Sequence, residues 1–262
     1  MIKKGNLRLL LMDIRYAVIS WRFLQSIVLG AAICFFTLLF CGDYQSETIH
    51  KYILLHDRAQ SFLAYIIGIL PSALAFYDDI AHSNMRNIVG RIKLRNYIFS
   101  KTITAFLTTI LAFTCGKMLF VTLHSIYNPV CLPESFSKLP DSLLYLDLAK
   151  EGHYLLYFLL SSLHKSFYCA VLCQIVMLFS ICIQNVSVIF SIPIAIFYVV
   201  HFYINNKIQL EYLNLSKVFD GATRIWPLDS QNFLYALFIM FVCGFLVYRM
   251  TLKIFERKMY HE

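Results

Sequence analysis

The residues of this sequence that could do chemistry gather in one charged segment, Tyr77–Lys101, which lies between two long apolar runs. Two adjacent carboxylates, Asp78 and Asp79, are followed by five basic residues from Arg86 to Lys101. Catalysis needs a nucleophile, a general base or a metal ligand positioned against a partner group, and this segment shows no such arrangement. A cluster of basic residues instead favours adhesion, either to anionic lipid headgroups or to an acidic groove on a partner protein. We therefore interpret the segment as adhesive rather than catalytic.

Motifs for nucleotide hydrolysis and for hydrolytic catalysis are missing from the sequence. A phosphate-binding loop needs a glycine-rich turn followed by Lys-Ser/Thr, and the stretch around Gly116 and Lys117 lacks the first glycine and the hydroxyl. Neither His-Glu-x-x-His nor Gly-x-Ser-x-Gly occurs. The histidines have no metal-ligand spacing, and Cys169 and Cys173 have no second pair of soft ligands nearby. We expect no metal, no cofactor and no catalytic residue in this chain.

The eight cysteines fall mostly inside apolar runs. A free cysteine in such a run behaves as a small hydrophobic residue, so we interpret most of them as packing residues. Cys41 and Cys131 are both expected near the outer surface, and a disulfide between them is left open.

Composition identifies the environment in which these residues act. Among 262 residues, 59% are hydrophobic and 15% are charged, and the mean hydropathy is +0.65; soluble domains have about 25% charged residues. Apolar runs near the length of a bilayer-spanning helix, about 20 residues, recur along the chain. The sequence therefore predicts an all-α, polytopic membrane protein with a single transmembrane domain over residues 1–262. We predict six spanning helices, at about 23–41, 60–77, 102–123, 154–182, 186–204 and 231–250, with a kink at Pro193 in the fifth.

An amphipathic stretch, residues 1–22, precedes the first predicted span. Its apolar residues recur at steps of three and four, and a stripe of basic residues lies beside them; the named positions are Leu7, Leu11, Ile14, Val18 and Trp21, with Arg8, Arg15 and Arg22. Such a helix lies in the membrane interface, where arginines reach the headgroups and tryptophan marks the boundary. We predict an interfacial elbow helix; the alternative is a cytoplasmic extension of the first span.

The distribution of basic residues predicts the orientation of the spans. With the N-terminus in the cytoplasm, 14 of the 23 lysines and arginines fall in cytoplasmic segments, in accordance with the positive-inside rule. We expect a multi-pass plasma-membrane protein with both termini in the cytoplasm, whose first apolar run is a retained anchor rather than a cleaved signal peptide. The net charge of +8 then reflects topology and does not indicate nucleic-acid binding.

Segment 78–101 is cytoplasmic in this topology. Met85, Ile88 and Ile92 recur at steps of three and four, which suits a short helix lying across the membrane plane, and Gly90 can end or bend it. The alternative is a loop whose charges only fix the topology. That alternative explains the basic residues, but neither the apolar stripe nor the two carboxylates at the end of the span.

The stretch "DDIAHSNMRNIVGRIKLRNYIFSK" resembles the cytoplasmic loop of ABC-2-type transporter permeases. In that family an acidic residue ends the second span, a short amphipathic helix follows, and a basic pattern containing a tyrosine leads into the third span. The matching positions in this chain are Asp79, Gly90, Arg91, Arg95, Tyr97, Ser100 and Lys101. The elbow helix, the six spans and the cytoplasmic ends agree with the layout of the same family.

The resemblance implies that this chain is the membrane subunit of an ABC exporter of the small peptide-export or peptide-immunity type. Its charged segment would be a coupling helix that docks on a separate ATPase, which is present in two copies and binds the ATP and Mg²⁺. A second permease subunit, identical or homologous, and the lipid bilayer are the other expected partners. The expected coupling residues are Asp78, Asp79, Met85, Arg86, Ile88, Gly90, Arg91, Ile92, Arg95 and Lys101. The implied cargo is a bacteriocin-type antimicrobial peptide or another amphipathic compound.

Lys117 and Lys165 are charges within predicted spans. A charge at such a position is costly and often functional, so both are candidates for lining a translocation path; the alternative is that they snorkel to the outer surface. Two other classes of protein stay open. A membrane enzyme, such as an intramembrane protease or a lipid-modifying enzyme, would need converging polar groups within the spans. A non-transporting sensor or anchor subunit would bind its ATPase without substrate-dependent ATP turnover.

Overall fold

The computed structural model describes residues 4–40, 47–57, 62–81, 92–131, 142–183, 185–200, 211–220 and 224–261. Within these ranges all regular secondary structure is helical and no strand occurs, so the all-α prediction is confirmed there. Four helices are long and apolar enough to cross a membrane: α2 (Trp21–Phe40), α7 (Leu94–Tyr127), α9 (Tyr154–Ser180) and α13 (Asp229–His261). Length and composition thus agree with a membrane protein.

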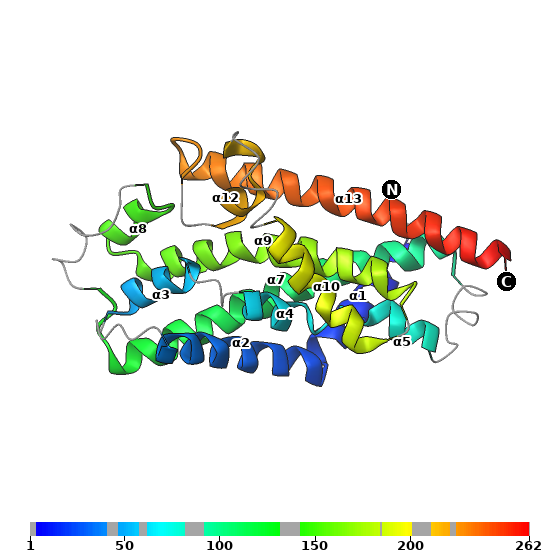
Figure 1. The fold of residues 1–262 in the computed structure, drawn as a ribbon, viewed down its shortest axis with the longest axis horizontal. Helices are drawn as coiled ribbons and strands as arrows, with labels where there is room; N and C mark the ends of the chain where they lie inside the picture. The colour runs from blue at the N-terminus through cyan, green and yellow to red at the C-terminus, as the bar shows by residue number, and fades with distance from the viewer. Residues whose placement is uncertain are drawn as a thin grey trace.

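The four long helices run along the longest axis of the molecule (Figure 1). Helix α9 packs against α7 and α13, and α7 packs against α2. The apolar window of α9 is 83% buried inside the protein, whereas those of α2 and α13 are 28% and 22% buried. Helix α9 is therefore central, and α2 and α13 present large apolar side chains on the outside of the bundle, among them Phe238 and Phe241.

The N-terminal region forms two helices that meet at a bend. Helix α1 (Lys4–Ile19) packs along α7 and is separated from α2 by Ser20. The Ser20 hydroxyl accepts a hydrogen bond from the backbone N–H of Phe23 at 3.2 Å, which caps the start of α2. The structure therefore places helices where the sequence predicted the amphipathic stretch and the first span.

The second predicted span, 60–77, is not a continuous helix. Helix α4 (Phe62–Ile69) and helix α5 (Ala75–Ala81) are separated by a turn that contains Pro71. Proline has no backbone N–H and disfavours helical geometry in the preceding residue, so a helix ends readily at this point. Helix α10 (Val186–Tyr198), in contrast, continues through Pro193, where the sequence analysis placed a kink.

Two further boundaries differ from the prediction. Helix α7 begins at Leu94 rather than near residue 102, so the last part of the predicted cytoplasmic segment forms its first two turns. Helix α13 extends well beyond residue 250, to His261. The described part of the fifth predicted span contains α10, which has 13 residues. The described residues thus contain four long helices, and the described parts of segments 60–77 and 186–204 contain shorter ones.

The remaining helices are short. Helices α3 (Thr48–Asp57) and α8 (Leu146–Lys150) lie at one end of the bundle, and α5 and the C-terminus lie at the other (Figure 1). Helix α12 (Leu215–Asp220) follows the 3₁₀ turn Glu211–Leu213 and packs against α9 and α13. One end of the bundle therefore carries connecting helices, and the other carries the two ends of the charged segment.

Candidate functional site

The two ends of the charged segment meet in the structure. The Asp79 carboxylate at the end of α5 accepts a hydrogen bond from the Tyr97 hydroxyl at 2.5 Å. It also forms an ion pair with Lys101 Nζ at 3.1 Å, and both partners belong to α7. Tyr97 is almost completely buried, and its ring packs 6.1 Å from that of Phe76, between ring centroids. Since a hydrogen bond to a charged group is stronger than one between neutral groups, this contact fixes α5 against α7.

Two more contacts extend this cluster to the N-terminal helices. Asp78 pairs with Arg22 at the start of α2, with 2.5 Å between Oδ2 and the guanidinium nitrogen. The Ser100 hydroxyl on α7 donates to the Asp13 carboxylate on α1, also at 2.5 Å. We call the seven residues Asp13, Arg22, Asp78, Asp79, Tyr97, Ser100 and Lys101 the charged junction. It connects α1, α2, α5 and α7 at one end of the bundle.

The contacts of the charged junction differ in strength. Arg22 and Asp78 have half and a third of their side chains exposed, at 49% and 34%, so solvent screens their attraction and the pair contributes little. Asp79 and Lys101 are more buried, with only 16% and 23% of their side chains exposed. Phe76, which contacts Tyr97, also packs against Phe255 of α13 at a centroid distance of 5.2 Å. The Asp79–Tyr97 contact is therefore the part of the junction that is continuous with the apolar core.

The predicted coupling residues are only partly within the described ranges. Five of them lie outside the described residues: Met85, Arg86, Ile88, Gly90 and Arg91. Ile92 is half-buried just before α7, and Arg95 is exposed on the first turn of α7. Asp78, Asp79 and Lys101 belong to the charged junction. The apolar stripe of the proposed coupling helix is thus still a prediction, whereas the residues that flank it come together.

The arginines of the predicted elbow lie on the surface. Arg8 and Arg15 are exposed on α1, as are the apolar residues Leu7 and Leu11, and Arg22 and Trp21 are exposed at the start of α2. An exposed apolar stripe beside arginines is the surface expected of a helix lying in a membrane interface. The opposite side of α1 packs on α7.

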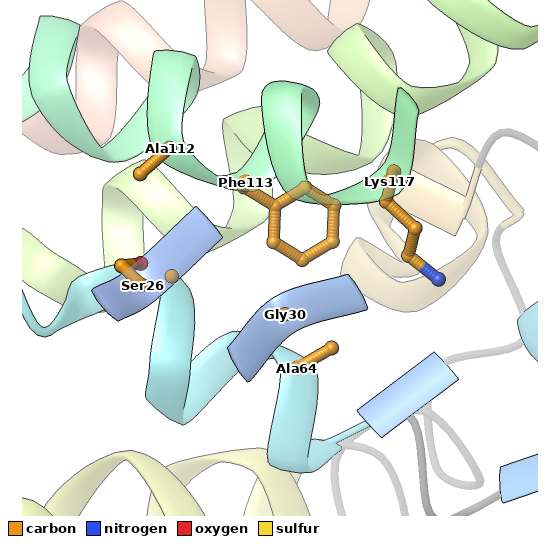
Figure 2. A pocket seen from close by; sticks show the side chains of 7 residues that line it. Ser26, Gly30, Ala64, Ala112, Phe113 and Lys117 are labelled. Atoms are coloured by element: carbon orange, nitrogen blue, oxygen red, sulfur yellow. The ribbon is translucent and has the colours of Figure 1, made fainter. Parts of the chain in front are cut away.

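Lys117 is buried in α7, with 4% of its surface exposed. Its Nζ lies 5.9 Å from the ring centroids of Tyr52 and Phe113, which is within the range of a cation–π contact, and no carboxylate among the described residues pairs with it. It lines a cavity of about 10 Å³ between α2, α4 and α7, with Gly30 and Phe113 among its neighbours in Figure 2. This volume suits one water molecule.

Lys165 is also buried, with 2% of its surface exposed, but it pairs with Asp220 of α12 at 3.3 Å. The preceding residue, His164, contacts the Tyr145 hydroxyl and the Val218 carbonyl oxygen, at 3.0 and 2.7 Å. Both lysines thus lie inside the protein and face different partners. The sequence analysis did not identify Asp220, because α12 fell in a segment interpreted as an outer loop.

A second ionic cluster lies at the other end of the bundle. The Arg224 guanidinium donates to Asp229 of α13 at 2.8 Å and to Asp147 of α8 at 2.7 Å, and its backbone N–H donates to the Ser142 carbonyl oxygen. Burial lowers the pKa of Arg224, but the hydrogen bonds to Asp147 and Asp229 outweigh it and raise the pKa. These contacts tie connecting segments to α13, so we interpret this cluster as structural.

No group of three or more potential metal ligands occurs among the residues that the structure describes. Cys169 and Cys173 are completely buried in α9, which agrees with their interpretation as packing residues. Cys131 is partly buried, and Cys41 lies outside the described residues.

Comparisons with protein-family models, with curated proteins and with solved structures found no match to this chain.

Proposed function

We propose that this chain is the membrane subunit of an exporter driven by a separate ATPase, with six spans and both termini in the cytoplasm. One observation carries the proposal most directly. Asp79, Tyr97 and Lys101 flank the segment that resembles a coupling helix, and they meet in one cluster although they come from both sides of it. A segment held in this way at both ends can act as a lever on the helices that it joins.

The charged junction supplies the route for such a movement. A displacement of residues 82–93 pulls on α5 and α7 together, because Asp79 bonds to Tyr97 and Lys101. The contacts of Asp78 with Arg22 and of Ser100 with Asp13 extend the movement to α2 and α1. In this proposal, closure of the ATPase pushes the segment, and the junction converts the push into a rearrangement of the spans.

The proposed cargo is an amphipathic or apolar peptide that passes between two permease subunits. The exposed apolar faces of α2 and α13 are available for contact with lipid and with a second subunit. ATP hydrolysis is assigned to the partner, because this sequence has no phosphate-binding loop.

The apolar stripe of the segment can be tested by comparing Ile88→Ala with Arg91→Ala. An exposed ion pair contributes at most about 1 kcal/mol, whereas a buried apolar anchor at an interface contributes about 2 kcal/mol or more. We expect Ile88→Ala to reduce co-purification of the ATPase and transport more strongly than Arg91→Ala does. If replacing Met85, Ile88 and Ile92 together by serine leaves ATPase binding and transport undiminished, the segment is a topogenic loop and the proposal is wrong.

The junction can be tested with Tyr97→Phe. This change removes the hydroxyl that bonds to Asp79 and keeps the ring that packs on Phe76. We expect the ATPase to co-purify as before while substrate-dependent ATP turnover falls. Tyr235→Phe is a matched control, because the Tyr235 hydroxyl also makes one hydrogen bond, to the Tyr212 carbonyl oxygen, away from the junction. Equal turnover in the two variants would contradict a mechanical role for the junction.

A further inference from the structure

A cavity of about 450 Å³ opens beside the charged junction, between α1, the start of α2, α5 and α7. Pockets for small molecules in proteins have volumes of about 300–1,000 Å³, so this one is large enough for a ligand. Its wall carries charges of both signs, three carboxylates and two cations: Asp13, Asp78 and Asp79, with Arg22 and Lys101. Such a wall suits a ligand that is itself charged, and the surplus carboxylate favours one with a cationic group.

Two groups in the cavity wall have polar capacity that the protein does not use. The Asp13 carboxylate accepts the Ser100 hydroxyl, and no lysine or arginine among the described residues pairs with it. Only 5% of the surface of Thr104 is exposed, and its hydroxyl has no hydrogen-bond partner among the residues that the structure describes. A buried hydroxyl without a partner is costly. The Asp13 carboxylate is thus available to a ligand, and the Thr104 hydroxyl, whose oxygen is buried behind the cavity surface, can donate to a ligand after its side chain rotates.

The mouth of the cavity has the character of a membrane interface. Tyr16 and Trp21 line the cavity and are exposed, at 73% and 68%. Tyrosine and tryptophan with one apolar and one polar side are typical of the headgroup level of a bilayer. Exposed apolar side chains, Leu24 and Val28, continue along α2 from this point. If α2 crosses the bilayer, the cavity opens where lipid headgroups lie, and the apolar face below it can contact acyl chains.

We propose that this cavity binds the headgroup of an aminophospholipid, of the phosphatidylethanolamine type. The ammonium group donates to the Asp13 carboxylate, and the phosphate accepts from the Thr104 hydroxyl and from the free N–H groups of Lys101. A choline headgroup has no N–H to donate to Asp13, so the site discriminates against it. This proposal requires only that α2 spans a bilayer; it does not depend on an ATPase partner.

The first test measures which lipids stay bound. The full-length protein is reconstituted in nanodiscs that contain equal amounts of phosphatidylethanolamine, phosphatidylcholine and phosphatidylglycerol, and the retained lipids are identified by native mass spectrometry. We expect phosphatidylethanolamine to be retained about tenfold over phosphatidylcholine, since a charge-assisted hydrogen bond distinguishes them. Equal retention of the two zwitterionic lipids would overturn the proposal.

Two variants connect the lipid to the cavity. Asp13→Asn keeps the acceptor for Ser100 and removes the charge, and Thr104→Val removes a hydroxyl that has no protein partner while keeping the side-chain shape. We expect Asp13→Asn to abolish the preference for phosphatidylethanolamine. Thr104→Val should lower the retention of both zwitterionic lipids, because the phosphate is common to them. If Asp13→Asn folds poorly, Thr104→Val still tests the site. If Thr104 only packs in the cavity wall and does not contact the lipid, this variant should retain lipids as the wild type does. Asp147→Asn, at the opposite end of the bundle (Figure 1), is the control and should keep the preference.

A soluble ligand with the same headgroup is tested separately. The chain has two tryptophans, so Trp226→Phe leaves Trp21, in the cavity wall, as the single fluorescent reporter. We expect Trp21 emission to change when phosphatidylethanolamine replaces phosphatidylcholine in the nanodisc. Free phosphoethanolamine, added to nanodiscs without phosphatidylethanolamine, should reproduce the change only at millimolar concentration. A change at micromolar concentration, without retained phosphatidylethanolamine, would identify a soluble ligand and overturn the lipid as the occupant.

Discussion

At the scale of single residues, the two buried lysines show how surroundings decide the effect of a charge. Lys165 pairs with Asp220, whereas Lys117 lies near two aromatic rings without a carboxylate among the described residues. Removing one member of a buried pair leaves the other charge uncompensated. Removing a buried charge that has no carboxylate relieves a desolvation cost instead.

Methionine substitution at each lysine separates these two cases, because methionine keeps most of the apolar stem. We expect Lys165→Met to destabilise the protein by about 1–3 kcal/mol, less than for a fully buried pair because Asp220 is partly exposed at 29%. Lys117→Met should be neutral or stabilising. Thermal unfolding in detergent measures both, and a larger loss for Lys117→Met would show that its ammonium has a partner that stabilises it.

The thiol of Cys131, which follows the C-terminal end of α7, should react with maleimide at a rate that depends on pH. Burial, followed by the nearby Glu47 carboxylate, raises the pKa of Cys131 to about 11. Only the thiolate reacts with maleimide, so below pH 11 the rate should rise about tenfold per pH unit. In a variant that retains Cys131 alone, Glu47→Gln removes a negative charge, lowers the pKa and speeds the reaction at pH 8. Identical reaction rates with and without Glu47 would contradict the placement of the Glu47 carboxylate near Cys131.

At the scale of helices, hydropathy located four long apolar helices, but it did not predict the break in the second span or several of the helix ends. The first span, predicted at 23–41, is α2 (Trp21–Phe40), because its ends coincide with a change in polarity. Helix α7 starts before its apolar run, because backbone hydrogen bonding continues into the polar residues around Lys101. The break at Pro71 was missed because an apolar run around it was counted as one span.

The candidate site was only partly predictable for a related reason. Asp79, Tyr97 and Lys101 were identified from a local pattern, and the structure brings them together. The other contacts join residues that are far apart in the sequence, such as Asp13 with Ser100 and Lys165 with Asp220. Periodicity describes neighbours on one helix and cannot identify such pairs. No signal in the sequence assigned Asp13 or Asp220 to a site.

The approach of α2 to α7 gives a prediction about a pair of glycines. A Cβ atom on Gly116 would lie 3.2 Å from the Ile27 carbonyl oxygen, whereas one on Gly30 would meet only the Gly116 Cα, at 3.7 Å. Close helix packing in membranes depends on such small residues. We expect Gly116→Ala to lower stability by about 1–3 kcal/mol and Gly30→Ala to have less effect, both measured by thermal unfolding. The reverse order would contradict the close contact at Gly116.

At the scale of the whole molecule, the two ends of the bundle have different chemistry. One end has the charged junction and the open cavity, and the other has the cluster of Arg224 with Asp147 and Asp229. In the proposed orientation the junction faces the cytoplasm. The exposed apolar faces of α2 and α13 lie between the two ends.

Cysteine labelling tests this orientation directly. In a cysteine-free background, single cysteines near Asp43 and Glu134 should react with a membrane-impermeant maleimide from the outside. Cysteines at Gly90 and near Glu262 should react only after the membrane is opened. A Gly90→Cys variant that is labelled only from the outside would overturn the orientation and, with it, the proposed docking of a cytoplasmic ATPase.

The central position of α9 has a consequence for the biogenesis of the chain. Its mean hydropathy, 1.4, is the lowest of the four long helices, and it carries His164 and Lys165, whose partners Val218 and Asp220 belong to α12. Because the ribosome makes α12 after α9, α9 reaches the translocon before these partners exist, and charged residues insert poorly on their own. Helix α7, already synthesised, offers it a hydrogen bond, from the Gln174 amide to the Thr102 carbonyl oxygen. If α9 crosses the bilayer, we expect its entry to be coupled to the assembly of its neighbours, and we expect a chain truncated before α12 to insert less efficiently.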